Sequence, residues 1–149
     1  MLLIQQGPLD VDALLSRWYA AEHDKNYGAM VSFVGTVRAE NGVEGLSFDI
    51  YRPILKKWFE SWRQRLAERG AHLEMAHSEG DVPAHKSSFA CAIFSPKRRV
   101  ALEGLDEFVE DFKANAPIWK YDLVGGKRVY AADRSTPMSG SGLLAGGGA

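Results

Sequence analysis

Basic side chains gather at both ends of one predicted helix. Lys97, Arg98 and Arg99 occupy its first turn. Lys113 lies in its last turn, and Lys120 follows after a proline. The helix dipole disfavours cations in a first turn, but free backbone amides point out of the same end. Amides, dipole and cations together would bind a phosphate or a carboxylate. Alternatively, the three side chains point into solvent and bind nothing.

The two lysines that follow could perform acid–base chemistry. The turn at Pro117 can bring Lys113 and Lys120 close together, and a nearby like charge lowers the pKa of a lysine. Such a lysine can transfer a proton or hold an anion. The residue types alone leave this open, since cations are favoured at helix C-termini and Lys120 could extend its charge into solvent. Arg38, beside a glycine-containing turn, is a third candidate for anion binding.

The length of the predicted helix separates its two basic ends. Lys97 and Lys113 are 16 residues apart, which corresponds to about 24 Å at ~1.5 Å per residue. If both ends serve one small substrate, they must come from two chains, which predicts a two-fold homodimer. The alternatives are two separate sites, or one site and one ordinary surface.

Other familiar chemistry is missing from the sequence. It contains neither a Walker-type phosphate loop nor a GxGxxG motif. The histidines show no metal-ligand spacing; they are His23, His72, His77 and His85. We therefore predict no metal and no cofactor. Cys91 lies in an apolar stretch and is interpreted as a core thiol, because burial raises a thiol pKa. His77 ends a predicted strand and is interpreted as structural.

Length and composition suit one domain without extended charged surfaces. The chain has 149 residues and a net charge of -1, so it lacks the basic excess of a dedicated nucleic-acid binder. One cysteine cannot form an internal disulfide and fits a reducing compartment. Neither a signal peptide nor a run of ~18 apolar residues is evident. We predict a cytoplasmic protein that binds neither nucleic acid nor membranes.

Capping residues predict three helices that would position the basic side chains. Asp10 is a good N-cap for the first. Pro53 suits the first turn of the second, which Gly70 would end. Ser95, followed by proline, predicts the N-cap of the third, which Pro117 would end. The apolar stripe of this last helix comprises Ala101, Leu105, Phe108, Val109 and Phe112.

Apolar, β-branched runs predict strands between the helices. The predicted strands cover residues 29–37, 45–51, 72–77, 87–94, 118–124 and 128–132. Asn41–Gly42 would join the first two strands as a hairpin turn, and Gly125–Gly126 would join the last two. The order predicts an α+β fold, a single domain with a largely antiparallel sheet and three helices. The domain would cover residues 1–134, and the glycine- and serine-rich residues 135–149 would form a mobile tail.

Two of these segments carry a family resemblance. The sequence from Phe33 to Arg38, followed by Asn41–Gly42, resembles the N-terminal signature of the molybdopterin synthase large (catalytic) subunit, the MoaE family. Residues 113–120, KANAPIWK, resemble that family's KTxAPxWK motif. His77 and Gly80 match its His-Arg-x-Gly stretch. The resemblance covers roughly residues 27–133 and implies a hammerhead-like α/β arrangement.

Three departures from the family pattern indicate a divergent branch. Lys97 stands where members commonly carry histidine, so the charge is kept and the titratable imidazole is lost. Ser78 replaces an arginine. The sequence Asp-Ile-Tyr-Arg-Pro at residues 49–53 replaces Glu-His-Tyr-Pro-Gly.

The resemblance implies a specific sulfurtransferase reaction. Two sulfurs would pass from the thiocarboxylated C-terminal glycine of a small ubiquitin-like partner to cyclic pyranopterin monophosphate, giving molybdopterin for molybdenum cofactor biosynthesis. The assembly would be a heterotetramer built on a homodimer of large subunits. Lys113 and Lys120 match the catalytic lysines. Substrate-binding positions are implied for Arg38, Lys97, Arg98, Phe33 and Arg134.

Two other functions remain open from the residues alone. One is a non-catalytic module that binds a ubiquitin-like tail or a phosphorylated ligand. The other is a small RNA-binding domain that uses the basic helix end, which the near-neutral net charge disfavours.

Overall fold

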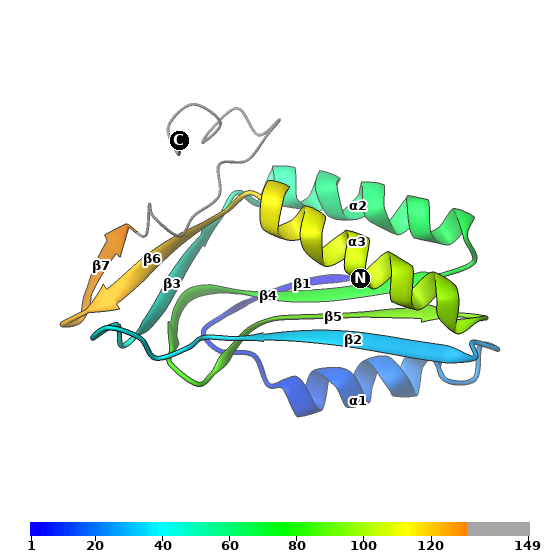
Figure 1. Cartoon of the computed structure of the whole chain (residues 1–149), viewed down its shortest axis with the longest axis horizontal. Coiled ribbons are helices and arrows are strands. Elements are labelled where there is room, and N and C mark those ends of the chain that lie inside the picture. The colour runs from blue at the N-terminus through cyan, green and yellow to red at the C-terminus, as the bar shows by residue number, and fades with distance from the viewer. Residues whose placement is uncertain (131–149) are drawn as a thin grey trace.

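Helices cover both faces of one twisted sheet (Figure 1). The computed structural model describes residues 1–130. Its helices are α1 (Val11–Glu22), α2 (Arg52–Glu68) and α3 (Arg98–Asn115). Its strands are β1 (Leu2–Gln6), β2 (Ala29–Thr36), β3 (Gly45–Ile50), β4 (His72–Pro83), β5 (Ser87–Ser95), β6 (Ile118–Val124) and β7 (Lys127–Tyr130). The domain boundary predicted at residue 134 and the tail at 135–149 lie outside the described residues.

The sheet is antiparallel except at one strand, which confirms the predicted fold class. The strand order is β2-β5-β4-β3-β6-β7, and β1 pairs with β4 in parallel. Strand β1 was not predicted from the sequence. It has only five residues and pairs with a strand about 70 residues away, so its local sequence pattern is weak. Strand β4 is longer than predicted, because its second half pairs with β3 after its first half has paired with β5.

The turn at Asn41–Gly42 does not make the predicted hairpin between neighbouring strands. Both residues have positive φ, 48° and 77°, and Glu40 bridges to Val43, so the turn itself is present. However, β2 pairs with β5, whereas β3 pairs with β4 and β6. The turn therefore lies in a loop that crosses from the sheet edge to the sheet interior.

Alternation along the central strands produces a core on each face of the sheet. Leu73, Met75 and Cys91 face α2 and α3, whereas Ala76 and Ala92 face α1. Burying these apolar side chains removes their surface from water, which is the main favourable term in folding. None of the three helices in residues 1–130 has the length and apolar composition of a membrane span.

The predicted N-terminal residues are found in place in two of the three helices. Asp10 caps α1, where its Oδ1 accepts from the amide of Ala13 at 3.1 Å. Pro53 lies in the first turn of α2, as predicted. The predicted N-cap of α3 is wrong, since Lys97 occupies that position without a side-chain cap. Ser95 ends β5, and its hydroxyl donates to the Lys97 carbonyl at 2.6 Å.

Candidate active site

A pocket of about 760 Å³ is lined by residues from the C-terminal end of α3 and from the sheet. Four of the predicted site residues line it: Phe33, Arg38, Lys113 and Lys120. They come from β2, the loop after it, α3 and β6. The chain therefore gathers an aromatic ring and three cations from segments that are far apart in the sequence.

The last turn of α3 places Lys113 against this pocket. Phe112, the preceding residue, stacks on Phe89 of β5. One residue earlier in the helix, Asp111 accepts from the indoles of Trp58 and Trp62 of α2, at 2.8 and 2.6 Å. The turn that carries Lys113 is thus fixed by packing on one side and by hydrogen bonds on the other.

Lys120 reaches the same pocket from the sheet. Helix α3 ends at Asn115, and β6 begins at Ile118 after the turn at Pro117. In the register of β3 and β6, Lys120 pairs with Phe48, which also lines the pocket. The proline turn therefore brings Lys113 and Lys120 to one cavity, as the sequence predicted.

Arg38 and Phe33 form the outer part of the pocket. The Arg38 side chain is 79% exposed, and its Nη2 lies 2.9 Å from Oε1 of Glu40. The Phe33 ring is 39% exposed and contacts Phe89 at a centroid distance of 5.8 Å. An exposed aromatic ring and an exposed arginine in the same pocket are well suited to a ligand that is flat at one end and anionic at the other.

His77 is a pocket residue that the sequence reading treated as structural. It lines the cavity although its side chain is only 3% exposed. Burial lowers its pKa to about 4, a hydrogen bond with Ser78 opposes this shift, and the charge of Lys120 adds to it. The imidazole is therefore neutral at physiological pH. The sequence signal was a histidine at the end of a buried strand, which does not distinguish a core position from a site position.

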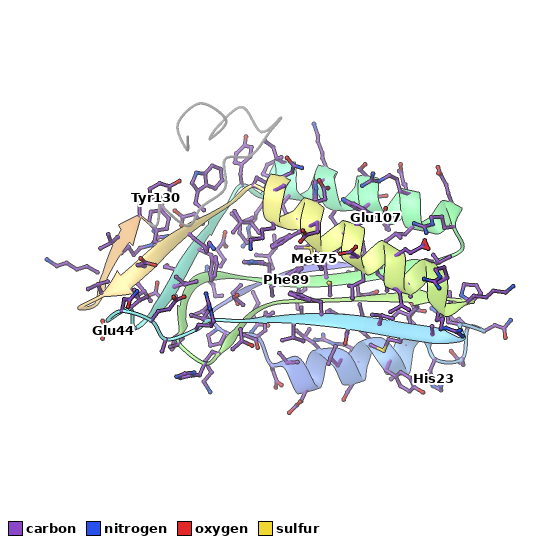
Figure 2. The ribbon with its side chains drawn as sticks, viewed as in Figure 1. His23, Glu44, Met75, Phe89, Glu107 and Tyr130 are labelled. Carbon is purple, nitrogen blue, oxygen red and sulfur yellow. The ribbon has the colours of Figure 1, made fainter. Side chains whose placement is uncertain are left out.

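Aromatic rings surround the deep side of the pocket. His77 contacts Phe48 edge-on at 5.0 Å and lies 5.8 Å from Phe89 and 5.6 Å from Phe112, centroid to centroid. Phe89 and Met75 lie in the core between the sheet and helices α2 and α3 (Figure 2). The deep side of the pocket thus has aromatic walls close to a few cationic groups, and surroundings of low polarity strengthen electrostatic interactions.

The other predicted basic residues lie at the opposite end of α3. Lys97, Arg98 and Arg99 line a second pocket of about 490 Å³ with Gly28 and Pro96. Helix α3 separates this pocket from Lys113, so one chain does not bring the two basic groups together. Arg134, the remaining predicted site residue, lies outside the described residues.

Cys91 and the carboxylate–histidine cluster on α1 and β4 lie outside the pocket that Lys113 and Lys120 line. Cys91 is fully buried, and burial raises the pKa of its thiol to about 12, against a lowering by a backbone hydrogen bond from Phe33. This confirms a core thiol. Glu22, His72 and Glu74 bring potential ligand atoms within 4.8 Å of one another. They are engaged in ion pairs, such as His72 Nε2 to Glu22 Oε1 at 2.8 Å, and none of them lines the pocket.

Comparison with known proteins identifies the family. The sequence model of the MoaE protein family matches residues 4–115. The molybdopterin synthase catalytic subunit of Helicobacter pylori strain 26695 is 52% identical over 145 residues, which cover 97% of this chain and 100% of that protein. The corresponding subunit of Dictyostelium discoideum is 31% identical over 116 residues, covering 73% of each chain.

Solved structures agree with the sequence comparison. A complex of subunits 1 and 2 of molybdopterin-converting factor from Helicobacter pylori 26695 contains a chain that matches with a TM-score of 0.91 and 52% identity, covering 96% of this chain and 98% of that one. The MoaE protein of Burkholderia ambifaria matches with a TM-score of 0.69 and 27% identity, covering 91% of each chain. These matches confirm the resemblance seen in the sequence motifs, and the chain belongs to the MoaE family, which includes molybdopterin synthase catalytic subunits.

Proposed function

We propose that this chain is the catalytic subunit of a molybdopterin synthase and acts as a sulfurtransferase. Its substrates would be cyclic pyranopterin monophosphate and the thiocarboxylated C-terminal glycine of a small ubiquitin-like partner. The observation that carries the proposal is the meeting of Lys113, Lys120 and Arg38 in one aromatic-walled pocket. The solved complex of subunits 1 and 2 from Helicobacter pylori supports the partner.

The cations of the pocket would reduce the repulsion between the two anionic substrates of this reaction. The phosphorylated pterin and the thiocarboxylate are both anions, so bringing them together is unfavourable without compensating positive charge. Lys113 and Lys120 provide that charge from two sides of a cavity with apolar walls. Fixed charges in such a site stabilise developing negative charge more strongly than water does.

The lysines also provide the protons that the transfer requires. In each transfer the sulfur forms a bond to a pterin carbon, which loses its bond to an oxygen, and water supplies the oxygen that replaces sulfur in the partner's carboxylate. Opening the cyclic phosphate and expelling oxygen from carbon both need proton donors. Ammonium groups in the pocket can serve as general acids, and we assign this role to Lys113 and Lys120. Phe33 and Arg38 would bind the pterin and its phosphate at the mouth.

The second basic pocket would complete the site in a homodimer. Lys97 and Arg98 lie at the far end of α3 from Lys113, so they would serve the same substrate from the partner subunit. The free amides at the N-terminus of α3 add to their affinity for phosphate. Mixing the Lys113→Ala and Arg98→Ala proteins tests this arrangement. A heterodimer would contain one intact shared site, and random exchange of subunits would restore about 25% of wild-type activity. No recovery on mixing, with subunit exchange verified, would show that each site belongs to one chain.

A sulfur-transfer assay tests the function directly. The purified chain is mixed with a thiocarboxylated small subunit and cyclic pyranopterin monophosphate, and the pterins are analysed by mass spectrometry. A product with two added sulfurs is expected. Binding of both substrates without sulfur transfer would instead indicate a non-catalytic binding module, and absence of binding would reject the proposal.

A further inference from the structure

His77 combines deep burial with access to the active-site pocket. It is the last residue of β4 that pairs with β5, and its partner there is Phe89. Its side chain is 3% exposed and lies among the rings of Phe48, Phe89 and Phe112. Burying a polar ring among phenylalanines costs free energy unless its nitrogens are used. The size of this cost depends on what each ring nitrogen contacts.

One ring nitrogen is committed to the backbone. Nδ1 of His77 lies 2.7 Å from the carbonyl oxygen of Ser78. A carbonyl only accepts hydrogen bonds, so Nδ1 carries the proton and donates it. In a neutral imidazole the other nitrogen, Nε2, is then a hydrogen-bond acceptor. The backbone bond thus fixes both the tautomer and the orientation of the ring.

Lys120 is a cation whose charge acts on the His77 ring. Phe48 pairs with Lys120 across β3 and β6, and paired residues point to the same side of a sheet. Phe48 also touches the His77 ring, so the strand register brings Lys120 and His77 to one face. Both line the pocket, and the charge of Lys120 disfavours protonation of His77. The other charged groups that line the pocket are Arg38, Glu40 and Lys113.

We propose that His77 is a positioning residue whose Nε2 accepts a hydrogen bond from the ammonium group of Lys120 and so holds this lysine toward the substrate. A carboxylate in the same place would neutralise the pocket and repel an anionic substrate. A neutral imidazole orients the lysine and leaves the positive charge intact. The proposal rests on the sulfurtransferase function for its effect on catalysis, but the contact itself can be measured independently.

Two amide substitutions separate the roles of the ring nitrogens. His77→Asn places its amide near the position of Nδ1 and lacks an acceptor at Nε2. His77→Gln extends to the position of Nε2. If the contact with Lys120 matters, kcat for sulfur transfer should fall about 10- to 100-fold in His77→Asn, with KM for the pterin changed less than about threefold. His77→Gln should recover at least a third of the wild-type kcat.

A purely structural histidine would behave differently. The Asn variant keeps the group that bonds to Ser78, so it would then be the better tolerated of the two. Thermal melting of both variants shows how much of any loss comes from unfolding. His23→Asn, at the exposed C-terminal end of α1 and away from the pocket, is the matched control (Figure 2). Equal kcat in His77→Asn and wild type would overturn the proposal.

Chemical labelling provides a test that does not depend on turnover. The rate at which acetic anhydride modifies Lys120 is followed by mass spectrometry between pH 7 and 11, with Lys113 as an internal reference. An acceptor stabilises the ammonium form, so its loss in His77→Asn should move the Lys120 labelling curve to lower pH by about one unit. The Lys113 curve should stay in place. Superimposable Lys120 curves in wild type and variant would reject the contact, whether or not the chain transfers sulfur.

Discussion

The ring of Phe112 lies face to face with the ring of Phe89, with centroids 4.2 Å apart and planes only 3° from parallel. Phe112 immediately precedes Lys113, and Phe89 belongs to the central strand β5. The stack therefore connects the last turn of α3 to a strand that has neighbours on both sides in the sheet. Residues that hold a catalytic group in place contribute to the rate without contacting the substrate.

Replacing Phe112 by leucine should loosen that turn. The substitution keeps an apolar side chain but removes the stack, so we expect a loss of about 1–2 kcal/mol in the free energy of unfolding. Sulfur transfer should fall more than this loss of folded protein explains. Phe108→Leu is the matched control, since Phe108 is fully buried on the same helix and does not line the pocket. Similar activity losses in both variants at similar stability would argue against a special role for the stack.

Lys113→Ala should abolish most of the activity and leave the fold intact. Removing a cation and proton donor from the pocket should lower kcat about 100- to 1000-fold. Urea unfolding should be nearly unchanged, because Lys113 lies at a helix end where its loss costs only some tenths of a kcal/mol. Lys57→Ala, exposed on α2, provides the control. Normal turnover of Lys113→Ala would exclude a catalytic role for this lysine.

Stability should depend on pH through His77. The pKa of His77 is lowered from 6.5 to about 4 by burial. Above pH 6.5 the imidazole is neutral in the folded and unfolded states, so its contribution is fully present. As the pH falls toward 4, the unfolded chain binds a proton that the folded chain excludes. The free energy of unfolding should drop by up to about 3 kcal/mol over this interval. Urea titrations at several pH values measure the slope.

The His77→Gln protein isolates this contribution, because glutamine does not titrate. Its stability should change less between pH 7 and pH 4.5 than that of the wild type. Parallel curves would show that His77 does not titrate abnormally.

Asp111 should be a major stabiliser of the contact between α2 and α3. Its Oδ2 accepts from both Trp58 and Trp62, and its Oδ1 accepts from Asn115 at 2.6 Å. Asp111→Ala would leave two indole N–H groups without this acceptor, and we expect a loss of about 2–4 kcal/mol in chemical unfolding. Asp111→Asn keeps one acceptor oxygen and should lose less. A loss below 1 kcal/mol in the alanine variant would contradict this view.

The local parts of the fold were predictable because their signals are local. Asp10 caps α1, and apolar residues at helical spacing mark the buried faces of α2 and α3. The convergence of Lys113 and Lys120 followed from the proline turn that separates them. Each of these predictions depends on residues within about ten positions of one another.

The missed features depend on partners far away in the sequence. Strand β1 exists because it pairs in parallel with β4, some 70 residues later. The turn at Asn41–Gly42 suggested a hairpin, but the sheet places β5 and β4 between β2 and β3. His77 was interpreted as structural because it ends a predicted strand. Its place in the pocket depends on Phe48 and Lys120, which belong to other strands.

Strand β4 passes from one set of neighbours to another beside the pocket. His77 is its last residue that pairs with β5, and Gly80, with φ of 82°, is its first that pairs with β3. The pocket therefore straddles a seam between two sub-sheets, with Phe33 on one side and Lys120 on the other. A ligand that contacts both walls connects the two sub-sheets. Binding should then couple the local opening of the two sub-sheets. The amide hydrogens of β3 and β6 should exchange at rates similar to those of β2 and β5 when the ligand is bound.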